Sequence, residues 1–434
     1  MGIGKEIAAQ LPLAQGQVWQ RLKEQLQSIG RDPVQVFEFA HEFLVCRNKC
    51  STLFVTALNY LSQEQLGALV ALAVPICQED GISDTAAGDV LDYVCRPFPE
   101  LLHPYIETIF EISLQERYGK FEQAWRGLDR ARIEIFKTRL LSGKDTEADE
   151  QRNHKKEFTI SHRLFMCLMN TRDPETILFA LQHARTHKIT PPWEIDEDYF
   201  QRVHLADVGF ARKGSALVSI YPNKPYHFIF VRGDGFPQED PRLKSVLPIQ
   251  QRFRFGGNAT LTPDEPYPFS HILTLDPIPA GVHVTGLPRL VLGAYITEIN
   301  HYGVCFYQHD ANGNPQQKIA PAEFVEVERR YIDYPFRETT VLLAPTPERF
   351  ACGEWGDPAS QFRLGGEPSW IQNPDVPVCP HCGETMEFLL QLDTGLPDTD
   401  PDRKDGEVYF GSGGMCYVFW CDTCKVSSYF EQCT

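Results

Sequence analysis

Basic residues are scarce in this 434-residue sequence, which has 41 lysines and arginines against 58 aspartates and glutamates and a formal net charge of −17. Acidic residues outnumber basic ones in both halves of the chain, so the charge is not confined to a tail. A protein of this charge repels phosphates, and we therefore expect no nucleic-acid partner. A basic protein partner suits the charge, although solubility alone accounts for it equally well.

The sequence also lacks long apolar runs and targeting signals. The longest apolar run, Leu66–Cys77, is too short to cross a bilayer and contains Pro75. No apolar segment of a signal peptide follows the first six residues, and Glu6 stands where a myristoylation signal requires Ser or Thr. These absences predict a cytoplasmic protein without a membrane partner.

The motifs of common catalytic sites are missing as well. No Gly-Lys pair is followed by Ser or Thr, which excludes a P-loop. His41-Glu42 begins like a zinc-protease helix, but Val45 stands where the second histidine belongs. We therefore predict no catalytic residues and favour a non-enzymatic binding protein. An enzyme with a cleft between its domains is the alternative, since active-site residues converge in space without leaving a sequence pattern. A second alternative is that the protein is an architectural adaptor.

The thirteen cysteines are the chemistry that the chain does have. Their odd number, in a chain without a secretory signal, argues against a disulfide framework. Cys379 and Cys382 form one C-x-x-C pair and Cys421 and Cys424 form a second, with 38 residues between the pairs. Each C-x-x-C turn places two thiolates on one side, and two such turns complete a tetrahedral shell of four sulfurs. The sequence therefore predicts a structural, zinc-ribbon-like site.

Two alternatives to this ligand set stay open at the level of sequence. The four residues could be separate reduced cysteines without a metal. Cys416 and Cys433 are also close enough in sequence to replace one of the four ligands. Because a four-thiolate shell has no open position, catalysis by the metal is not expected in either case.

Two other groups invite a metal interpretation and do not support it. His183 and His187 lie four residues apart on a predicted helix, but nothing nearby supplies a third ligand, so we interpret them as exposed polar side chains. The acidic segment 398–407 has alternating carboxylates, but Arg403 and Tyr409 occupy positions where a calcium loop requires Gly and Glu. We interpret this segment as a solvated loop that offers a contact surface to a basic partner. Its candidate contact residues are Asp398, Asp400, Asp402 and Asp405.

Trp370 is the remaining candidate contact residue. It follows the Gly365-Gly366 pair, which admits backbone torsions closed to other residues. Its large apolar face would either form a binding ledge or pack this turn against the first cysteine pair. Buried aromatic residues mostly serve cores, which favours packing.

The first part of the chain has helical periodicity. Apolar residues recur at three- and four-residue steps from Trp19 to Ile29. Asp32-Pro33 and Ser62 with Gln65 are typical of helix starts. The sequence predicts a helical domain over 1–145, followed by a linker and a helical pair over 146–200. The predicted pair is 161–170 and 173–187, and Thr190-Pro191-Pro192-Trp193 ends it.

From about residue 203, short apolar runs alternate with Pro, Gly, Asn and Asp, which is typical of strands joined by turns. We predict an α+β protein in which the helical N-terminal domain precedes a β-rich C-terminal domain over 201–434. Asp310–Asn314 is a candidate hairpin turn. The candidate strands are 216–220, 226–231, 271–275, 290–299, 304–308, 324–327, 340–343, 386–392, 408–410, 416–420 and 426–430.

Four stretches near the cysteine pairs resemble the YwqG-like family. They are Leu364–Gln372, Cys379–Gly383, Met386–Leu392 and Val418–Cys424. The resemblance is specific over residues 361–424, extends more weakly back to about residue 203, and does not cover the helical half. It implies a bacterial protein with a mixed, mainly β fold, in a family without an established biochemical activity. Some relatives are encoded beside polymorphic toxins and are proposed to be immunity proteins, so the resemblance implies a toxin-neutralising role and no catalytic residues.

Overall fold

The computed structural model describes most of the chain. The described residues are 3–13, 15–30, 32–115, 121–142, 159–187, 197–231, 235–240, 242–244, 246–259, 261, 267–319, 332–351, 357–400 and 406–434. Four sequence predictions fall partly or wholly outside them: the linker after residue 142, the helix stop at 190–193, the strand at 324–327 and the acidic segment 398–407. The chain divides into two compact units, Met1–Gln201 and Arg202–Thr434.

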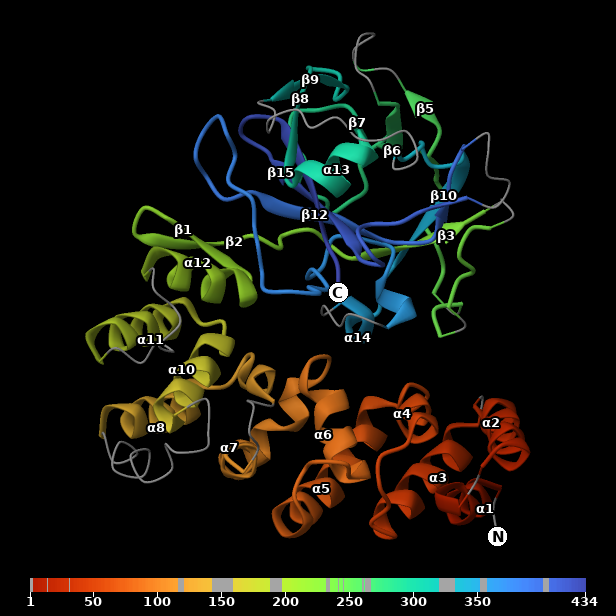
Figure 1. Cartoon of the computed structure of the whole chain (residues 1–434). Helices are drawn as coiled ribbons and strands as arrows, with labels where there is room; N and C mark the ends of the chain where they lie inside the picture. Colours follow the sequence, from red (N-terminus) through yellow and green to blue (C-terminus); the bar gives the residue numbers. More distant parts are fainter. Residues whose placement is uncertain are drawn as a thin grey trace. The chain divides into compact units, whose positions relative to one another are not determined.

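The first unit is helical (Figure 1, red to yellow). No helix in the described part of the chain combines the length and the apolar character that a bilayer span requires. The α-helices of this unit are α1 (Ile3–Gln10), α2 (Gln17–Ile29), α3 (Pro33–Val45), α4 (Thr52–Leu58), α5 (Gln63–Asp80), α6 (Ala86–Cys95), α7 (Ile106–Ser113), α8 (Arg130–Ser142), α10 (Ile160–Asn170) and α11 (Pro174–His187). Short 3-10 helices at Leu11–Leu13, Pro99–Leu101, His103–Tyr105 and Glu122–Trp125 join some of them.

Local capping explains where two of these helices begin. The Asp32 side chain accepts hydrogen bonds from the N–H groups of Val34 and Gln35, with Pro33 at the first helical position of α3. Ser62 and Gln65 form a reciprocal capping box at the start of α5. Both predicted helix starts are confirmed.

Aromatic side chains pack the core of the helical unit in two groups. Phe43 of α3 stacks on Phe54 of α4, with ring centroids 5.0 Å apart. Trp125 and Phe136 contact edge to face at 5.3 Å, and both also contact Phe110 of α7. All five rings are almost completely buried, so burial of aromatic surface stabilises this unit.

The second unit contains a large antiparallel sheet with the strand order β5-β6-β4-β10-β3-β11-β12-β15-β16-β8-β9, and β7 pairs with β6 (Figure 1). The strands of this sheet are β3 (Tyr226–Phe230), β4 (Arg252–Phe255), β5 (Asn258–Ala259), β6 (Phe269–Leu275), β7 (Leu290–Ala294), β8 (Cys305–His309), β9 (Pro315–Ile319), β10 (Thr339–Pro345), β11 (Arg363–Leu364), β12 (Glu387–Asp393), β15 (Met415–Cys421) and β16 (Val426–Gln432). Two smaller sheets pair β1 (Phe210–Lys213) with β2 (Ala216–Ser219) and β13 (Leu396–Pro397) with β14 (Glu407–Val408). The remaining helical segments are α12 (Glu197–Asp207), α13 (Ile296–Tyr302), α14 (Glu348–Ala351) and a 3-10 turn at Pro358–Ser360.

Strand β15 lies inside the sheet and is buried along its whole length. Its residues alternate between two apolar clusters, as the two-residue period of a strand requires. Val418 and Trp420 belong to the cluster that also contains Ile296 and Ile299 of α13, while Phe419 belongs to the cluster on the other face. The sheet therefore has a core on each face. The α+β fold, with the β-rich part after the helical part, is confirmed.

Two predicted strands are partly wrong: 408–410 is in a strand only at Val408, the end of β14, and 290–299 contains part of a helix. The run 290–299 was predicted to be a single strand, but β7 ends at Ala294 and α13 begins at Ile296. Continuous apolar residues do not distinguish a buried strand from a buried helix segment, so the boundary was hidden. By contrast, the predicted turn Asp310–Asn314 is confirmed between β8 and β9, where the Asp310 carboxylate accepts from the N–H groups of Asn312 and Asn314.

Candidate metal centre

The first cysteine pair lies on a tight turn that leads into β12. Val378 pairs with Thr385 across the base of this turn, and the Cys379 N–H donates to the carbonyl of Glu384 at 2.9 Å. Gly383 has a φ of 73°, and its N–H donates to the Cys379 carbonyl at 2.9 Å. Glycine adopts this left-handed conformation at little cost, so it closes the turn around both sulfurs.

The second pair lies on the turn between β15 and β16. Cys421 is the last residue of β15, and its carbonyl accepts from the N–H of Lys425 at 2.8 Å. The N–H of Cys424 donates to the Sγ of Cys421 at 3.5 Å. Backbone donors of this kind spread the negative charge of a thiolate, which stabilises a shell of several sulfurs around one ion.

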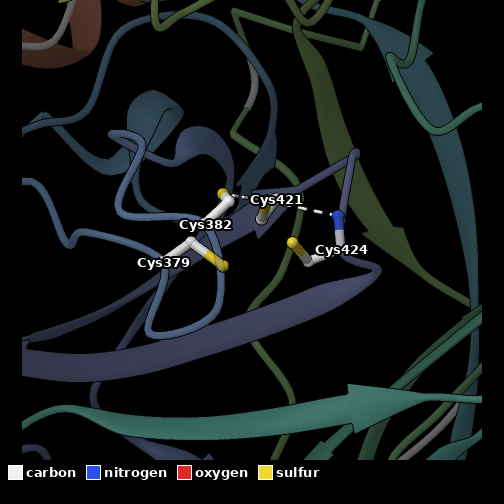
Figure 2. Close-up of side chains that lie close together, drawn as sticks. All are labelled: Cys379, Cys382, Cys421 and Cys424. Atoms are coloured by element: carbon white, nitrogen blue, oxygen red, sulfur yellow. Dashed lines mark hydrogen bonds between the residues drawn. The ribbon is translucent and has the colours of Figure 1, made fainter.

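Both turns bring their sulfurs to one place (Figure 2). The four Sγ atoms of Cys379, Cys382, Cys421 and Cys424 all lie within 4.8 Å of one another. In a tetrahedral shell with metal–sulfur bonds of about 2.3 Å, neighbouring sulfurs are about 3.8 Å apart. The Sγ atoms of Cys382 and Cys421 are 3.7 Å apart. The geometry therefore fits a four-coordinate metal ion, although it does not identify the element.

Burial and the contacts within the cluster change the pKa values of three of its thiols, Cys382, Cys421 and Cys424. Burial, together with hydrogen bonding to Cys382, raises the pKa of Cys424 to about 11, and burial raises that of Cys421 further. Burial also opposes ionisation of Cys382, but the Glu384 N–H and the neighbouring thiols outweigh it and lower its pKa. Of Cys382, Cys421 and Cys424, Cys382 is therefore the thiol that loses its proton most easily without a metal. A divalent cation would instead favour four thiolates and release protons on binding.

Asp422 holds the second turn against a neighbouring segment of the β-rich unit. Its Oδ1 accepts from the Thr285 N–H at 2.8 Å, from the indole N–H of Trp420 at 3.1 Å and from Lys425 Nζ at 3.0 Å. Burial opposes its ionisation, but these hydrogen bonds, led by those from Thr285, lower the pKa of Asp422 to about 2. No role for Asp422 was predicted from the sequence. Its position between Cys421 and Cys424 could have indicated that it helps to hold this turn.

Strand β8 supports the same turn from the other side. The Gln308 side chain donates to the Cys424 carbonyl at 2.8 Å, and the His309 N–H donates to the Lys425 carbonyl at 2.9 Å. The His309 ring contacts the Trp420 ring edge to face at 5.2 Å. Hydrogen bonds that fix the atoms around metal ligands orient the ligands themselves, so the second turn is pre-formed.

The proposed substitute ligands are not part of the cluster. Cys416 is completely buried in the core cluster that contains α13, and Cys433 lies beside Gly411. Among the described residues, no group of three or more potential ligands other than the four cysteines gathers in one place. His183 and His187 do lie together on α11, with ring centroids 4.2 Å apart, but they form no such group.

Trp370 packs against the sheet. It is half-buried, and its ring lies 4.8 Å from that of Tyr417 and stacks on those of Phe419 and Phe430 at 6.1 and 6.3 Å. The preceding Gly365 approaches the backbone so closely that a Cβ there would lie 2.4 Å from the Lys224 carbonyl oxygen. This turn therefore requires glycine, and it presents Trp370 to the core cluster.

The acidic loop requires a correction. Asp398 was predicted to belong to a contact surface, but it is only 7% exposed and its Oδ1 accepts from the Asp400 N–H at 3.0 Å. A carboxylate used inside the turn is not available to a partner. Asp400 is half-buried, and Asp402 and Asp405 lie outside the described residues.

Part of the chain is similar in sequence to one known protein. The chain is 28% identical over 172 residues to a Salmonella typhimurium protein named "Uncharacterized protein YpfL". The aligned part covers 38% of this chain and 37% of the relative, so the chain matches little more than a third of that protein's length. No family model matches the chain. No solved structure matches it either.

Proposed function

We propose that this chain is a non-enzymatic binding protein whose β-rich unit is stabilised by one structural zinc ion. The observation that carries the proposal is the gathering of four cysteine sulfurs within 4.8 Å. Four thiolates fill every position of a tetrahedral ion and leave none for a substrate or a reactive water. The ion then acts on the fold, where it ties the turn before β12 to the turn between β15 and β16.

Zinc suits this donor set better than other common ions. Soft thiolates in a tetrahedral arrangement select zinc or iron, whereas magnesium, calcium and manganese prefer oxygen ligands. Native mass spectrometry of the full chain, before and after treatment with a chelator, tests the assignment. One zinc ion per chain is expected, with loss of strand structure in the β-rich unit when the ion is removed. A folded, metal-free protein would overturn the assignment, and visible absorption would identify iron instead.

The proposed partner is a basic protein. The net charge of −17 favours such a partner electrostatically. The resemblance to the YwqG-like family makes a secreted or injected toxin the partner class that we favour, with this chain acting as its neutralising protein. Neutralisation by occlusion needs only a complementary surface and no catalytic group, which agrees with the closed metal site.

A charge-neutral variant tests the partner surface. In full-length protein, the change Asp400→Asn/Asp402→Asn/Asp405→Asn removes three charges from the acidic segment. We expect at least a tenfold loss of affinity for the partner recovered from the host cells, with a smaller difference at high salt. The matched control is Glu24→Gln/Glu64→Gln/Glu107→Gln, three exposed charges of the helical unit. Equal affinity of both variants would exclude the acidic segment as the contact, and recovery of no partner would argue against the binding role.

A small-molecule function is the second candidate, and one observation favours it. Within the β-rich unit, a cavity is lined by a buried histidine and a glutamate whose pKa values are both shifted. Perturbed titratable groups in a cavity are typical of functional sites. An enzyme or a ligand-regulated binding protein would have such a cavity, and a protein that works by surface complementarity alone would not need it.

A further inference from the structure

A cavity of about 330 Å³ lies in the β-rich unit, away from the four cysteines in the sequence. Residues of three segments line it: part of β3, residues 237–240 with 243 and 244, and residues 359, 361 and 362 just before β11. Its volume is at the lower end of the range for small-molecule sites. The lining combines aromatic side chains such as Phe230 and Phe362 with polar ones.

His227 is the most unusual group in this lining. It is 2% exposed, and neither ring nitrogen has a hydrogen-bond partner among the described residues. Burial lowers the pKa of His227 to about 4, so the ring is neutral at pH 7 and carries one donor and one acceptor. Buried polar groups are normally hydrogen-bonded, because an unmet one costs about 1–3 kcal/mol.

Two other buried histidines of the same unit show the usual arrangement. The His271 ring contacts the Gly256 carbonyl at 2.8 Å and the Thr274 hydroxyl at 2.7 Å. The His309 ring contacts the Gly313 carbonyl at 3.2 Å and the Ser427 hydroxyl at 2.8 Å. Both rings use both nitrogens within the protein. His227, which lines a cavity, uses neither.

Glu239 places a second unmet group beside the first. Its Oε1 is buried without a hydrogen-bond partner in the described structure, and burial raises the pKa of Glu239. This oxygen lies 3.5 Å from His227 Nε2, which is within ion-pair range but does not form a hydrogen bond. Since the imidazole is neutral, the contact is no salt bridge. Glu239 Oε1 and the acceptor nitrogen of the neutral His227 ring thus have no hydrogen-bond donor in the described structure, and both residues line the cavity.

The walls of the cavity are fixed to each other by Arg242. Its guanidinium donates to the carboxylates of Asp240, in the loop, and Asp357, which also accepts from the N–H of Ala359 at 2.9 Å. The loop that carries Glu239 is therefore tied to the segment that leads into β11. A site held in place before its ligand arrives loses less entropy on binding, so this cavity is pre-organised.

We propose that this cavity binds a small organic cation, an ammonium or guanidinium group on a short apolar body. The N–H groups of the cation donate to Glu239 Oε1 and to the unprotonated nitrogen of His227, and its apolar body packs against Phe230 and Phe362. A carboxylate and aromatic rings both attract a cation. An anionic ligand would meet the charge of Glu239, and a purely apolar one would leave both acceptors unmet.

Isothermal titration calorimetry on the full, metal-loaded chain tests this proposal. The probes are butylamine and butylguanidine, with pentanoate as the anionic control and butyramide as the neutral one. We expect saturable binding of at least one cation and at least tenfold weaker binding of pentanoate and butyramide. If no cation binds up to millimolar concentration, or if butyramide or pentanoate binds as tightly, the proposal is wrong. Saturable binding of a divalent metal at Glu239 in place of the amines would also overturn it.

Variants locate the binding. Glu239→Gln keeps the shape of the side chain and removes its charge, and should weaken cation binding at least tenfold. His227→Phe should do the same, and thermal unfolding shows whether this buried variant is folded. The control Glu338→Gln removes an exposed charge that pairs with Arg254 outside the cavity lining, and should leave affinity unchanged. Unchanged affinity of folded Glu239→Gln would exclude the site. The result is independent of the zinc assignment and of the protein partner.

Discussion

The Sγ of Cys382 lies 3.7 Å from the Sγ of Cys421, although the two residues are 39 positions apart in the chain. This separation is close to one edge of a tetrahedron of sulfurs around a zinc ion, which is about 3.8 Å. The contact joins the two C-x-x-C turns, so the four cysteines form one site and not two independent pairs. A metal at this site therefore crosslinks two turns that the backbone alone connects only through β12, β15 and the segment between them.

Replacing Cys382 should weaken metal binding strongly without a change in the helical unit. Cys382→Ser removes the exposed one of the four ligands, so little core packing is lost with it. We expect zinc affinity to fall by more than about 100-fold, since even residues that only support metal ligands contribute 10–100-fold. Native mass spectrometry gives the metal content. The control Cys50→Ser changes another exposed cysteine and should retain one zinc per chain. Full occupancy in Cys382→Ser would contradict the ligand assignment.

Asp422 should tune the site without ligating the metal. Asp422→Asn weakens the hydrogen bonds from Thr285, Trp420 and Lys425 that hold the second turn. We expect about 10–100-fold weaker zinc binding in competition with a chromophoric chelator, with the stoichiometry unchanged. Asp375→Asn, an exposed aspartate of the same unit, is the control. A loss of stoichiometry would mean that Asp422 is itself a ligand.

Trp370 should contribute to stability. Its ring stacks on Phe419 and Phe430, so Trp370→Ala should lower the free energy of unfolding of the β-rich unit by about 2–3 kcal/mol, less than the 3–5 kcal/mol of a fully buried Trp. Urea denaturation followed by near-UV circular dichroism measures the change. Tyr409→Ala, at an aromatic residue that is 50% exposed, should have a much smaller effect. If Trp370→Ala unfolds like the wild type, the residue is a surface contact and the packing interpretation fails.

Acid should destabilise the β-rich unit through its buried histidines. Burial lowers the pKa of His271 to about 4 from an ordinary value of 6.5. Because the unfolded chain binds the proton more tightly, the contribution of His271 to stability is present above pH 6.5 and is lost as the pH falls towards 4. Between pH 7 and pH 5 this loss is about 1–2 kcal/mol for one histidine.

The measurement is urea denaturation at pH 7 and at pH 5, with zinc held in excess. The glutamine side chain at position 271 does not titrate. The stability of His271→Gln should therefore fall less between the two pH values than that of the wild type. The control is His301→Gln, at an exposed position, which should show the wild-type pH dependence. Equal pH dependence of all three proteins would mean that His271 does not contribute.

Features that depend on residues close together in the chain were predicted correctly. The Asp32-Pro33 and Ser62–Gln65 helix starts depend on residues two or three positions apart, and both are confirmed. The gathering of the four cysteines was also predictable, because each C-x-x-C pair is a local turn and two such pairs leave few other arrangements. The boundary between β7 and α13 was not predicted, because it lies within residues 290–296, which are apolar and suit a buried strand or a buried helix equally.

The cavity could not have been predicted in this way. His227 lies in a strand and Glu239 in a loop, and their contact depends on how the loop returns over the sheet and on the Arg242 ion pairs that fix it there. Whether the ring nitrogens of a histidine form hydrogen bonds within the protein depends on tertiary packing. The burial of Asp398 is another such case, since its sequence context is entirely polar and acidic.

The strand order also constrains when this unit becomes complete during synthesis. Strands β15 and β16 lie between β12 and β8, so the β8–β9 hairpin pairs along its length with the large sheet through β16, the last of the described strands to be translated. A nascent chain that ends before Met415 lacks the strands that pair with β12 and with β8, and exposed strand edges of this kind favour association between chains. The helical unit does not depend on these late strands, because all of it precedes them in the chain. During synthesis, the β-rich unit is therefore prone to aggregate until β15 and β16 have been translated.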